Sequence, residues 1–425
     1  MSRLLELAVP RRLGSSYRWL VSSSWVSNLG DGIAAAAGPL LVASLTTNAF
    51  LVSLAALLRW APSLMLGLYA GVLSDRVDRR RIVMVADGSR VVVLIALAAA
   101  FASHRLTAVG ALVALGLLAV AEVFTDNTTA TLAPMLVDRD DLTLANARLQ
   151  TGFVTLNQLV GPPIGAALFA LGRVLPFAGQ ALLVAAGVLL VSRVRLPARD
   201  RAVAGTSVRR DIAEGFRWTL HHAAVRTLAL TILIFNVTFG AAWSVLVLYS
   251  QRQLGLGDVG FGLLITISAV GGLLGTGLYG WITKRVSLGN VMRVGLIIET
   301  LTHLGLAVTR SPWVASAILF VFGAHAFIWG TTSITVRQRA VPTHLQGRVG
   351  SVNTICVYGG LVVGSVVGGL LASRFGVTAP FWFAFGGSAV FVVVLWRELT
   401  RIAHADEETS PAEEIEGVAS AEPAV

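Results

Sequence analysis

Charged residues and cysteine are both scarce in this chain of 425 residues. Only 13% of the residues are charged, whereas about a quarter are charged in an ordinary soluble domain. This scarcity, with 55% hydrophobic residues, excludes an ordinary soluble fold. The single cysteine, Cys356, excludes an intrachain disulfide and a cysteine-rich metal site. Lys284 is the one lysine, so arginine accounts for almost all of the positive charge.

Sequence motifs of membrane enzymes are also missing. The chain contains no HExxH zinc motif, no GxSxG nucleophile motif and no aspartate-rich motif. We therefore expect a protein that is not an enzyme and that holds no metal and no cofactor. A polytopic membrane enzyme stays open as a remote alternative. The net charge of +10 points to a membrane surface as the partner, and not to nucleic acid.

Long apolar runs fill most of the chain. Twelve of them approach or exceed the roughly 20 residues that a bilayer-spanning helix needs. The strict alternation of outer-membrane strands is absent. The runs predict an all-α integral membrane protein with twelve transmembrane helices, near residues 19–46, 49–73, 82–103, 106–127, 149–172, 175–196, 225–250, 258–283, 289–309, 312–336, 349–373 and 377–397.

The arginines are distributed unevenly between the two sides that this map defines. With the N-terminus inside, 26 of the 33 basic residues fall on the cytoplasmic side, and each outer loop carries one. Positive charge marks cytoplasmic loops. The distribution predicts a multi-pass protein of a plasma membrane with both termini in the cytoplasm. Arginine-for-lysine usage and alanine richness are typical of a GC-rich bacterium, so we expect a bacterial cell membrane.

The chain divides into two similar halves. Gly67-Leu68-Tyr69 before one polar loop is echoed 210 residues later by Gly277-Leu278-Tyr279 before another. Two six-span halves with internal echoes are the layout of a secondary transporter. Between them, residues 209–222 have the spacing of an amphipathic helix on the membrane surface. We expect a cytoplasmic N-terminal segment, an N-terminal six-helix half, a cytoplasmic central loop, a C-terminal six-helix half and an acidic disordered tail, at 1–18, 19–196, 197–224, 225–398 and 399–425.

Two motifs carry a resemblance to a known family. The segment GVLSDRVDRRR (71–81) resembles the loop signature of the major facilitator superfamily, with Asp78 where glycine is usual. The segment 157–168 resembles the antiporter signature of the fifth span, through Gly161, Pro162 and Gly165. Further positions resemble the drug and siderophore exporter branch of that superfamily, among them Gly30-Asp31, Asp87, Arg90 and Arg337-Gln338.

The resemblance implies an alternating-access exporter driven by proton influx. It implies pseudo-symmetric halves, and a gating loop whose carboxylate sits against the start of span 11 and holds the halves together. The gating motif comprises Gly71, Asp75, Arg76, Arg79 and Arg80; simple topogenic charge is the alternative for its arginines. In the family, the antiporter motif is thought to limit proton leak. A packing kink is the alternative, since two prolines remove backbone donors there. No segment resembles a nucleotide-binding P-loop, so ATP is not the implied driver.

Acids inside the spans are the candidates for proton coupling, because a carboxylate at the bilayer centre costs at least about 2.5–3.5 kcal/mol. Asp31, between two glycines of span 1, is our first choice, with an ion pair to Arg59 as the structural alternative. Glu122 ranks second. Span 4 lacks the arginine typical of proton antiporters, and Arg59 would have to replace it. We expect Asp87 and Arg90 to form a structural pair beside the gating loop, and Glu299 to bond locally with His303 (a pair in span 9).

Aromatic and weakly polar residues predict the wall of a substrate cavity. They recur at helical spacing on spans 1, 7 and 10, and ordinary helix packing is the alternative. Such a wall suits a bulky, partly apolar ligand. The residues are Trp25, Asn28, Asn236, Phe239, Trp243, His325 and Trp329.

The combined prediction is a monomeric secondary active transporter. Its partners are the lipid bilayer, protons and a small hydrophobic or amphipathic substrate. We expect proton-coupled efflux of hydrophobic drugs or secondary metabolites by alternating access. A siderophore or other metabolite transporter of the same fold is the alternative. The sequence does not identify the substrate.

Overall fold

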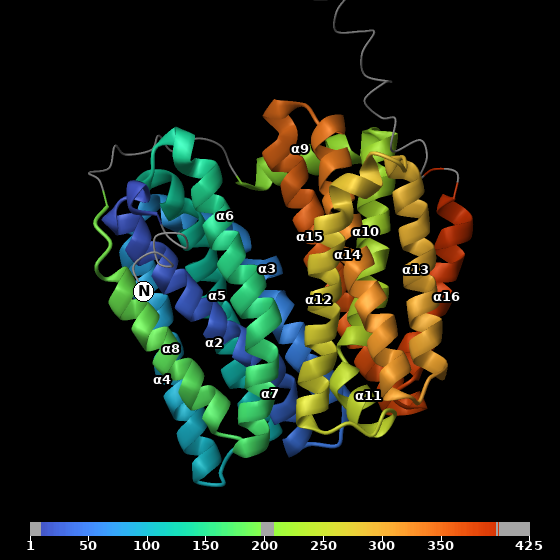
Figure 1. Ribbon diagram of the computed structural model, residues 1–425, viewed down its shortest axis with the longest axis horizontal. Coiled ribbons are helices and arrows are strands. Elements are labelled where there is room, and N and C mark those ends of the chain that lie inside the picture. Colours follow the sequence, from blue (N-terminus) through green and yellow to red (C-terminus); the bar gives the residue numbers. More distant parts are fainter. Residues whose placement is uncertain (1–9, 197–207, 397, 399–425) are drawn as a thin grey trace, which may run out of the picture.

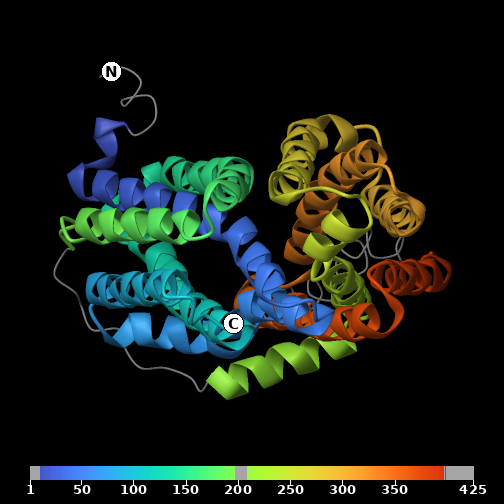
Figure 2. The same cartoon turned by 90° about the horizontal axis from the view of Figure 1, so that it is seen from below.

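The computed structural model describes residues 10–196, 208–396 and 398, and this part of the chain is built from helices joined by short loops. Figure 1 shows two groups of helices, one from the first half of the chain and one from the second. Figure 2 shows the same groups side by side. Most of the predicted N-terminal segment, the linker 197–207 and the predicted tail from 399 lie outside the described residues.

The N-terminal half runs from η1 to α8. Its fifth span is composite, because two helical segments flank a π-helical stretch, Phe153–Val160. The elements are η1 (Arg11–Leu13), α2 (Ser15–Leu45), α3 (Ala49–Arg76), α4 (Arg79–Ala102), α5 (Ala108–Leu136), η2 (Arg139–Asp141), α6 (Leu142–Gly152), η3 (Phe153–Val160), α7 (Gly161–Leu171) and α8 (Leu175–Val191).

The C-terminal half follows a surface helix, α9 (Val208–His221), that matches the predicted amphipathic helix over 209–222. Its seventh span is divided into α10 and α11 at Ser244–Val245. The elements are α10 (Ala223–Trp243), α11 (Leu246–Arg252), α12 (Asp258–Thr283), α13 (Leu288–Val308), α14 (Pro312–Ala340), η4 (Thr343–Leu345), α15 (Gln346–Phe375) and α16 (Ala379–Leu395).

Twelve apolar helical segments correspond to the twelve predicted spans. Within the described residues, ten are long and apolar enough to cross a membrane. The remaining two, α8 and α16, are apolar helices of 17 residues each, the lower limit for a span. The prediction of an all-α, twelve-span protein is confirmed.

Short polar residues begin several of these helices. The Asn48 carboxamide accepts a hydrogen bond from the Phe50 N–H at 2.9 Å, and Thr107 accepts one from Gly110 at 3.1 Å. Each satisfies a donor that the first turn of a helix leaves free. The predicted breaker at Thr46-Thr47-Asn48 is therefore also the cap of α3.

The two halves use glycine in the same way. A Cβ at Gly161 or Gly165 of α7 would collide with the backbone of Gly32 or Ile33 in α2. In the other half, a Cβ at Gly364 or Gly368 of α15 would collide with the α10 backbone. Spans 5 and 11 therefore approach spans 1 and 7 backbone to backbone, as small residues permit. The two halves therefore share this mode of helix packing.

The halves meet at the end of the molecule that carries α11. There, one buried apolar cluster joins α2 and α3 to α11 and α12, through side chains such as Leu41, Val52, Leu248 and Leu264. At the opposite end, where α9 lies (Figure 1), the halves have separate buried clusters around Leu132 and Val341. The structure is thus sealed across the halves at the α11 end.

Candidate functional site

A buried charge network links four helices of the N-terminal half. The Arg90 guanidinium of α4 forms an ion pair with Asp31 of α2 and a second with Asp87, whose Oδ1 lies 3.1 Å from Arg90 Nη1. Asp87 also accepts a hydrogen bond from Thr125 of α5 at 2.9 Å, and Asp31 accepts one from Gln180 of α8 at 3.5 Å. All five side chains are buried, and Asp87 is fully enclosed.

This geometry corrects the sequence interpretation of the network. The structure pairs Asp31 with Arg90 and not with Arg59, and Arg90 lies near the middle of α4. The pair of Asp87 and Arg90 is therefore part of the Asp31 site, in addition to being a local i,i+3 contact. The arginine beside Asp31 comes from span 3 and not from span 2. Sequence reasoning missed Thr125 and Gln180, because a buried hydroxyl or amide has no hydropathy signal of its own.

Two glycines flank Asp31 on α2. A Cβ at Gly30 would meet the side chain of Gln180 on α8, and one at Gly32 would collide with the Asn157 carbonyl group in the π-helical stretch. Helix α2 thus packs closely against α8 and the π-helical stretch at the level of Asp31.

The predicted antiporter motif lies at this same contact. Pro162 and Pro163 lack N–H groups, so the turn before them cannot close with ordinary α-helical hydrogen bonds; the π-helical stretch ends at Val160, immediately before Gly161. Ala166, which replaces the second glycine of the family pattern, faces Gly262 of α12, where a Cβ would collide with it. The motif therefore joins α2 and α7 of the N-terminal half to α12 of the C-terminal half.

A second group of charges is more accessible. On α5, Glu122 is half-buried and Asp126 is exposed. Arg59 of α3, which is half-buried against the Trp60 ring, interacts electrostatically with Glu122. Tyr358 of α15 interacts with the same charges, and its ring centroid lies 6.0 Å from that of Trp60. These residues face one another between the halves.

The gating-loop motif holds the start of α4 to its neighbours. Arg79 donates to the Ser74 carbonyl oxygen at 3.1 Å, and Arg80 donates to the Val194 carbonyl oxygen, beyond the end of α8, at 3.2 Å. Asp78 caps α4 by accepting from the Arg81 N–H at 3.0 Å, so the departure from the family glycine has a structural use. Gly71 has open space around it, Arg76 is exposed, and the Asp75 side chain lies outside the described part.

The predicted aromatic wall forms a ladder between α10 and α14. The rings of Phe235 and Trp329 stack at 5.4 Å, and those of Phe239 and Phe322 at 5.7 Å. Trp243 stacks on Phe239 at 4.7 Å. Phe235, Phe239 and Trp243 are half-buried.

The other predicted wall residues are directed elsewhere. His325 and Trp329 are buried and lie against Gly295 of α13. Trp25 donates from its indole N–H to the Arg148 carbonyl oxygen at 2.9 Å, which fastens α2 to α6. Asn28 and Asn236 donate to backbone carbonyl oxygens of their own helices. In this conformation, packing accounts for Trp25, His325 and Trp329.

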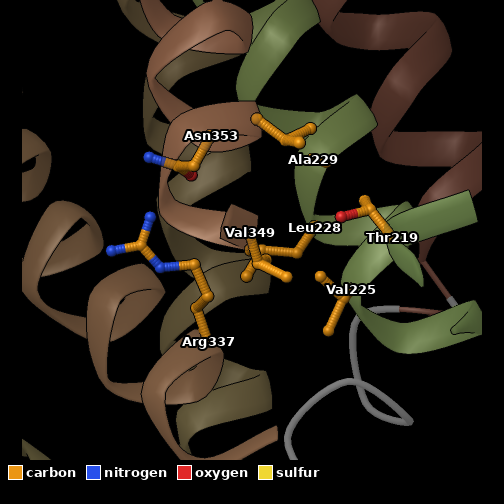
Figure 3. A pocket seen from close by; sticks show the side chains of 8 residues that line it. Thr219, Val225, Leu228, Ala229, Arg337, Val349 and Asn353 are labelled. Atoms are coloured by element: carbon orange, nitrogen blue, oxygen red, sulfur yellow. The ribbon is translucent and has the colours of Figure 1, made fainter. Parts of the chain in front are cut away.

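A pocket opens at the α9 end of the C-terminal half. It has a volume of about 200 Å³ and lies between α9, α10, α14 and α15. Figure 3 shows Arg337 and Asn353 on one side and Thr219 on the other, with Val225, Leu228 and Val349 near them. Within the described residues, no group of histidine, cysteine and acidic side chains has the arrangement of a metal site.

Comparison with known sequences identifies the family of this chain. A family model described as transmembrane secretion effector matches residues 10–422. The multidrug efflux pump Tap of Mycolicibacterium fortuitum is 27% identical over 85% of this chain and 90% of its own length. The enterobactin exporter EntS of Salmonella typhimurium is 26% identical over 84% of this chain and 85% of its own length.

Solved structures share the same fold at lower identity. The nucleoside transporter NupG has a TM-score of 0.73 at 13% identity, over 91% of this chain and 100% of its own. A bacterial homologue of the iron transporter ferroportin has a TM-score of 0.71 at 16% identity, over 91% of this chain and 98% of its own. The chain belongs to the transmembrane secretion effector family of the major facilitator superfamily, and it is a multi-pass membrane transporter.

Proposed function

We propose that this transporter exports hydrophobic or amphipathic small molecules in exchange for protons, by alternating access. The observation that carries the proposal is the buried network of Asp31, Arg90 and Asp87, in which one arginine serves two carboxylates. In the N-terminal half, Glu122 and Asp126 add two more acids, and Arg59 adds one more base. Four acids therefore share two arginines.

This imbalance favours bound protons. With all six groups ionised, the site would carry two uncompensated negative charges inside a membrane, and each intramembrane charge is costly. Protonation of two carboxyl groups removes that cost without any change of packing. The exposed Asp126 and half-buried Glu122 would exchange protons with water. A proton bound to the buried Asp31 would weaken its ion pair with Arg90, which keeps Asp87 as its partner.

The sealed α11 end supports alternating access. At the α11 end the two halves share one buried apolar cluster, and at the other end each half has its own cluster. We expect this arrangement in a transporter that is closed on one side of the membrane and open on the other. The arginine distribution supports a cytoplasmic α9 end, with both termini on that side. In this state a substrate would enter from the cytoplasm, between the halves.

The substrate class follows from the aromatic surface. The half-buried rings of Phe235, Phe239 and Trp243, and separately the ring pair of Trp60 and Tyr358, offer stacking area and few hydrogen bonds. Such a surface suits bulky, planar and partly apolar molecules. The likeness to the multidrug efflux pump Tap supports drugs or secondary metabolites, and that to the enterobactin exporter keeps an aromatic siderophore as the second candidate.

Inverted membrane vesicles test the proposal. A proton gradient should drive accumulation of a fluorescent amphipathic cation, and adding the substrate should release protons from wild-type vesicles. Asp31→Asn should insert normally and reduce accumulation to the passive level, since the amide cannot carry the proton. Asp140→Asn, which removes an exposed loop carboxylate, is the matched control and should behave as wild type. Normal uphill accumulation by Asp31→Asn would contradict the assignment.

A further inference from the structure

The C-terminal half contains a second cluster of buried ionisable side chains. Glu299 of α13 is fully enclosed, and its Oε1 lies 3.4 Å from His303 Nε2, one turn further along the same helix. Its Oε2 lies 4.0 Å from Nε2 of His325, on α14. Both histidines are also buried. We propose that Glu299, His303 and His325 form a second proton-binding site, separate from the Asp31 network.

No permanent cation lies around Glu299 among the described residues. Helix α16 contains no ionisable residue within its bounds. Helix α10 contains one, Arg226, which lies in its first turn. On α13, Arg293 lies near the start and contacts Trp396, and on α14, Arg337 and Arg339 lie in the last turn. Within the part of the chain that the structure describes, only the two histidines are placed to compensate the charge of Glu299.

Charge balance then requires a bound proton. An isolated carboxylate in the membrane interior is strongly disfavoured. Either Glu299 is a neutral acid beside neutral imidazoles, or it is a carboxylate beside one imidazolium ion. Both forms contain the same single proton, and transfer from the carboxyl oxygen to an imidazole nitrogen converts one into the other. Arg90 gives Asp31 a permanent partner, whereas Glu299 has only this proton.

Hydrogen bonding around the cluster fits this description. The Thr238 hydroxyl of α10 lies 2.9 Å from the Phe235 carbonyl oxygen and 3.3 Å from Glu299 Oε1. A hydroxyl has one proton and a carbonyl can only accept, so Thr238 bonded to Phe235 is free to accept from a protonated Glu299. The second carboxyl oxygen and both nitrogens of His303 have no hydrogen-bond partner within the described residues. A neutral His303 carries a hydrogen on one ring nitrogen, so its other nitrogen and the second carboxyl oxygen of Glu299 can accept the shared proton.

A small cavity adjoins the cluster. It has room for about one water molecule, and it is lined by Glu299, by the hydroxyl-bearing Thr231, Thr238 and Ser388, and by apolar side chains of α10, α13 and α16. Hydroxyl groups can both donate to and accept from water molecules. Release of the proton leaves a buried anion, so it requires water to reach Glu299 through this cavity.

The cluster also adjoins the proposed substrate surface. The His325 ring lies 6.2 Å from Phe322, edge to face, and Phe322 stacks on Phe239 of the aromatic ladder. His325 and Trp329 both pack on Gly295. A proton that moves from Glu299 to His325 would place positive charge beside these rings. In this respect the inference rests on the proposed function, whereas the proton site itself does not.

Proton counting on the purified protein in detergent tests the site directly. Wild type, Glu299→Gln and His303→Asn are taken from mildly acidic to mildly alkaline pH, and the protons released per molecule are measured. We expect Glu299→Gln to release one proton fewer than wild type. The amide carries no negative charge, so the neighbouring histidines need no bound proton to compensate it. His303→Asn should shift the same step along the pH axis. His344→Asn, which removes an exposed histidine, serves to measure the loss of an ordinary imidazole.

Infrared difference spectra with isotope-labelled histidine locate the proton. The carboxylic-acid or imidazolium signal lost at alkaline pH should be absent from Glu299→Gln and retained in Asp31→Asn. Equal proton release and unchanged spectra in folded Glu299→Gln would overturn the inference. A failure of substrate-driven proton release in vesicles, with the Glu299 titration intact, would instead overturn the proposed function alone. If Glu299→Gln does not fold, Glu299→Asp provides the second test and should shift the titration.

Discussion

The two halves of this transporter hold buried carboxylates by different means. In the N-terminal half, Arg90 pairs with both Asp31 and Asp87. In the C-terminal half, Glu299 has two histidines within 4.0 Å and no arginine among the described residues near it. A permanent cation lets a carboxylate remain ionised, whereas histidine does so only while it is protonated. Halves that share one fold can therefore differ in whether their buried acids depend on pH.

Removing Arg90 should produce the largest effect on this comparison. Arg90→Leu leaves Asp31 and Asp87 buried without a cation, and breaking a buried pair in this way costs about 3–5 kcal/mol. We expect low membrane levels and a much lower midpoint of thermal unfolding. The triple variant with Asp31→Asn and Asp87→Asn should regain most of the stability. Glu299→Gln, which removes no permanent charge pair, should remain folded; equal losses in Arg90→Leu and Glu299→Gln would break the contrast.

Leucine at the close-packed glycines should have the next largest effect, and the same one in both halves. Gly165→Leu and Gly364→Leu each force apart helices whose backbones touch, at a cost of about 1–3 kcal/mol. The echoed positions Gly67 and Gly277 have open space around them, so leucine there provides the matched controls. Thermal unfolding in detergent measures all four. A loss confined to one half would show that the halves do not pack equivalently.

Removing the N-terminal caps of the third and ninth spans should lower stability less than the changes above, and by different amounts in the two helices. Asp78→Ala removes a cap at 3.0 Å from the Arg81 N–H and should cost about 1 kcal/mol. Ser287 caps α13 at a longer 3.4 Å, and it lacks the negative charge that a helix N-terminus favours. Ser287→Ala should therefore shift the unfolding midpoint less than Asp78→Ala does. The reverse order would show that the cap of α4 does not set its stability.

The surface ion pairs at the α9 end should have the smallest effect. Arg348 joins α15 to Asp211 at 3.1 Å and Glu214 at 2.8 Å of α9, and such a pair contributes about 0.2–1 kcal/mol. Arg348→Ala should make α9 more sensitive to limited proteolysis while transport continues. In the other half, the exposed Arg12 contacts Asp141 at 3.4 Å, and Arg12→Ala should have no measurable effect on proteolysis.

Hydropathy and breaker residues were sufficient to predict the elements of the fold. The predicted twelve spans and the helix over 209–222 are present, because a helix in lipid must satisfy its own backbone and must be apolar over a bilayer's width. The internal division of spans 5 and 7 was not predicted. A kink at Pro162 was expected in the fifth span, but the prolines alone do not show that the turns before them become π-helical over Phe153–Val160.

The candidate site was only partly predictable. Asp31 was selected correctly as a buried acid, but its arginine was assigned to the wrong helix. Sequence spacing shows which residues share a face of one helix, and this was enough for Asp87 with Arg90 and for Glu299 with His303. It does not show how a helix is rotated against its neighbours. For that reason Arg90 was not linked to Asp31, and His325 was placed in the cavity wall and not beside Glu299.

By itself, the sequence determined that this chain is a twelve-span membrane protein with two related halves, because composition and periodicity are local properties that the bilayer selects. The tertiary structure decided which charges meet. Gly30 and Gly32 let α2 pack closely on α8 and on the π-helical stretch, Asp31 meets Arg90 of α4, and Gly295 lets His325 lie near Glu299. Contacts of this kind depend on the rotation and approach of whole helices, which only packing in three dimensions sets.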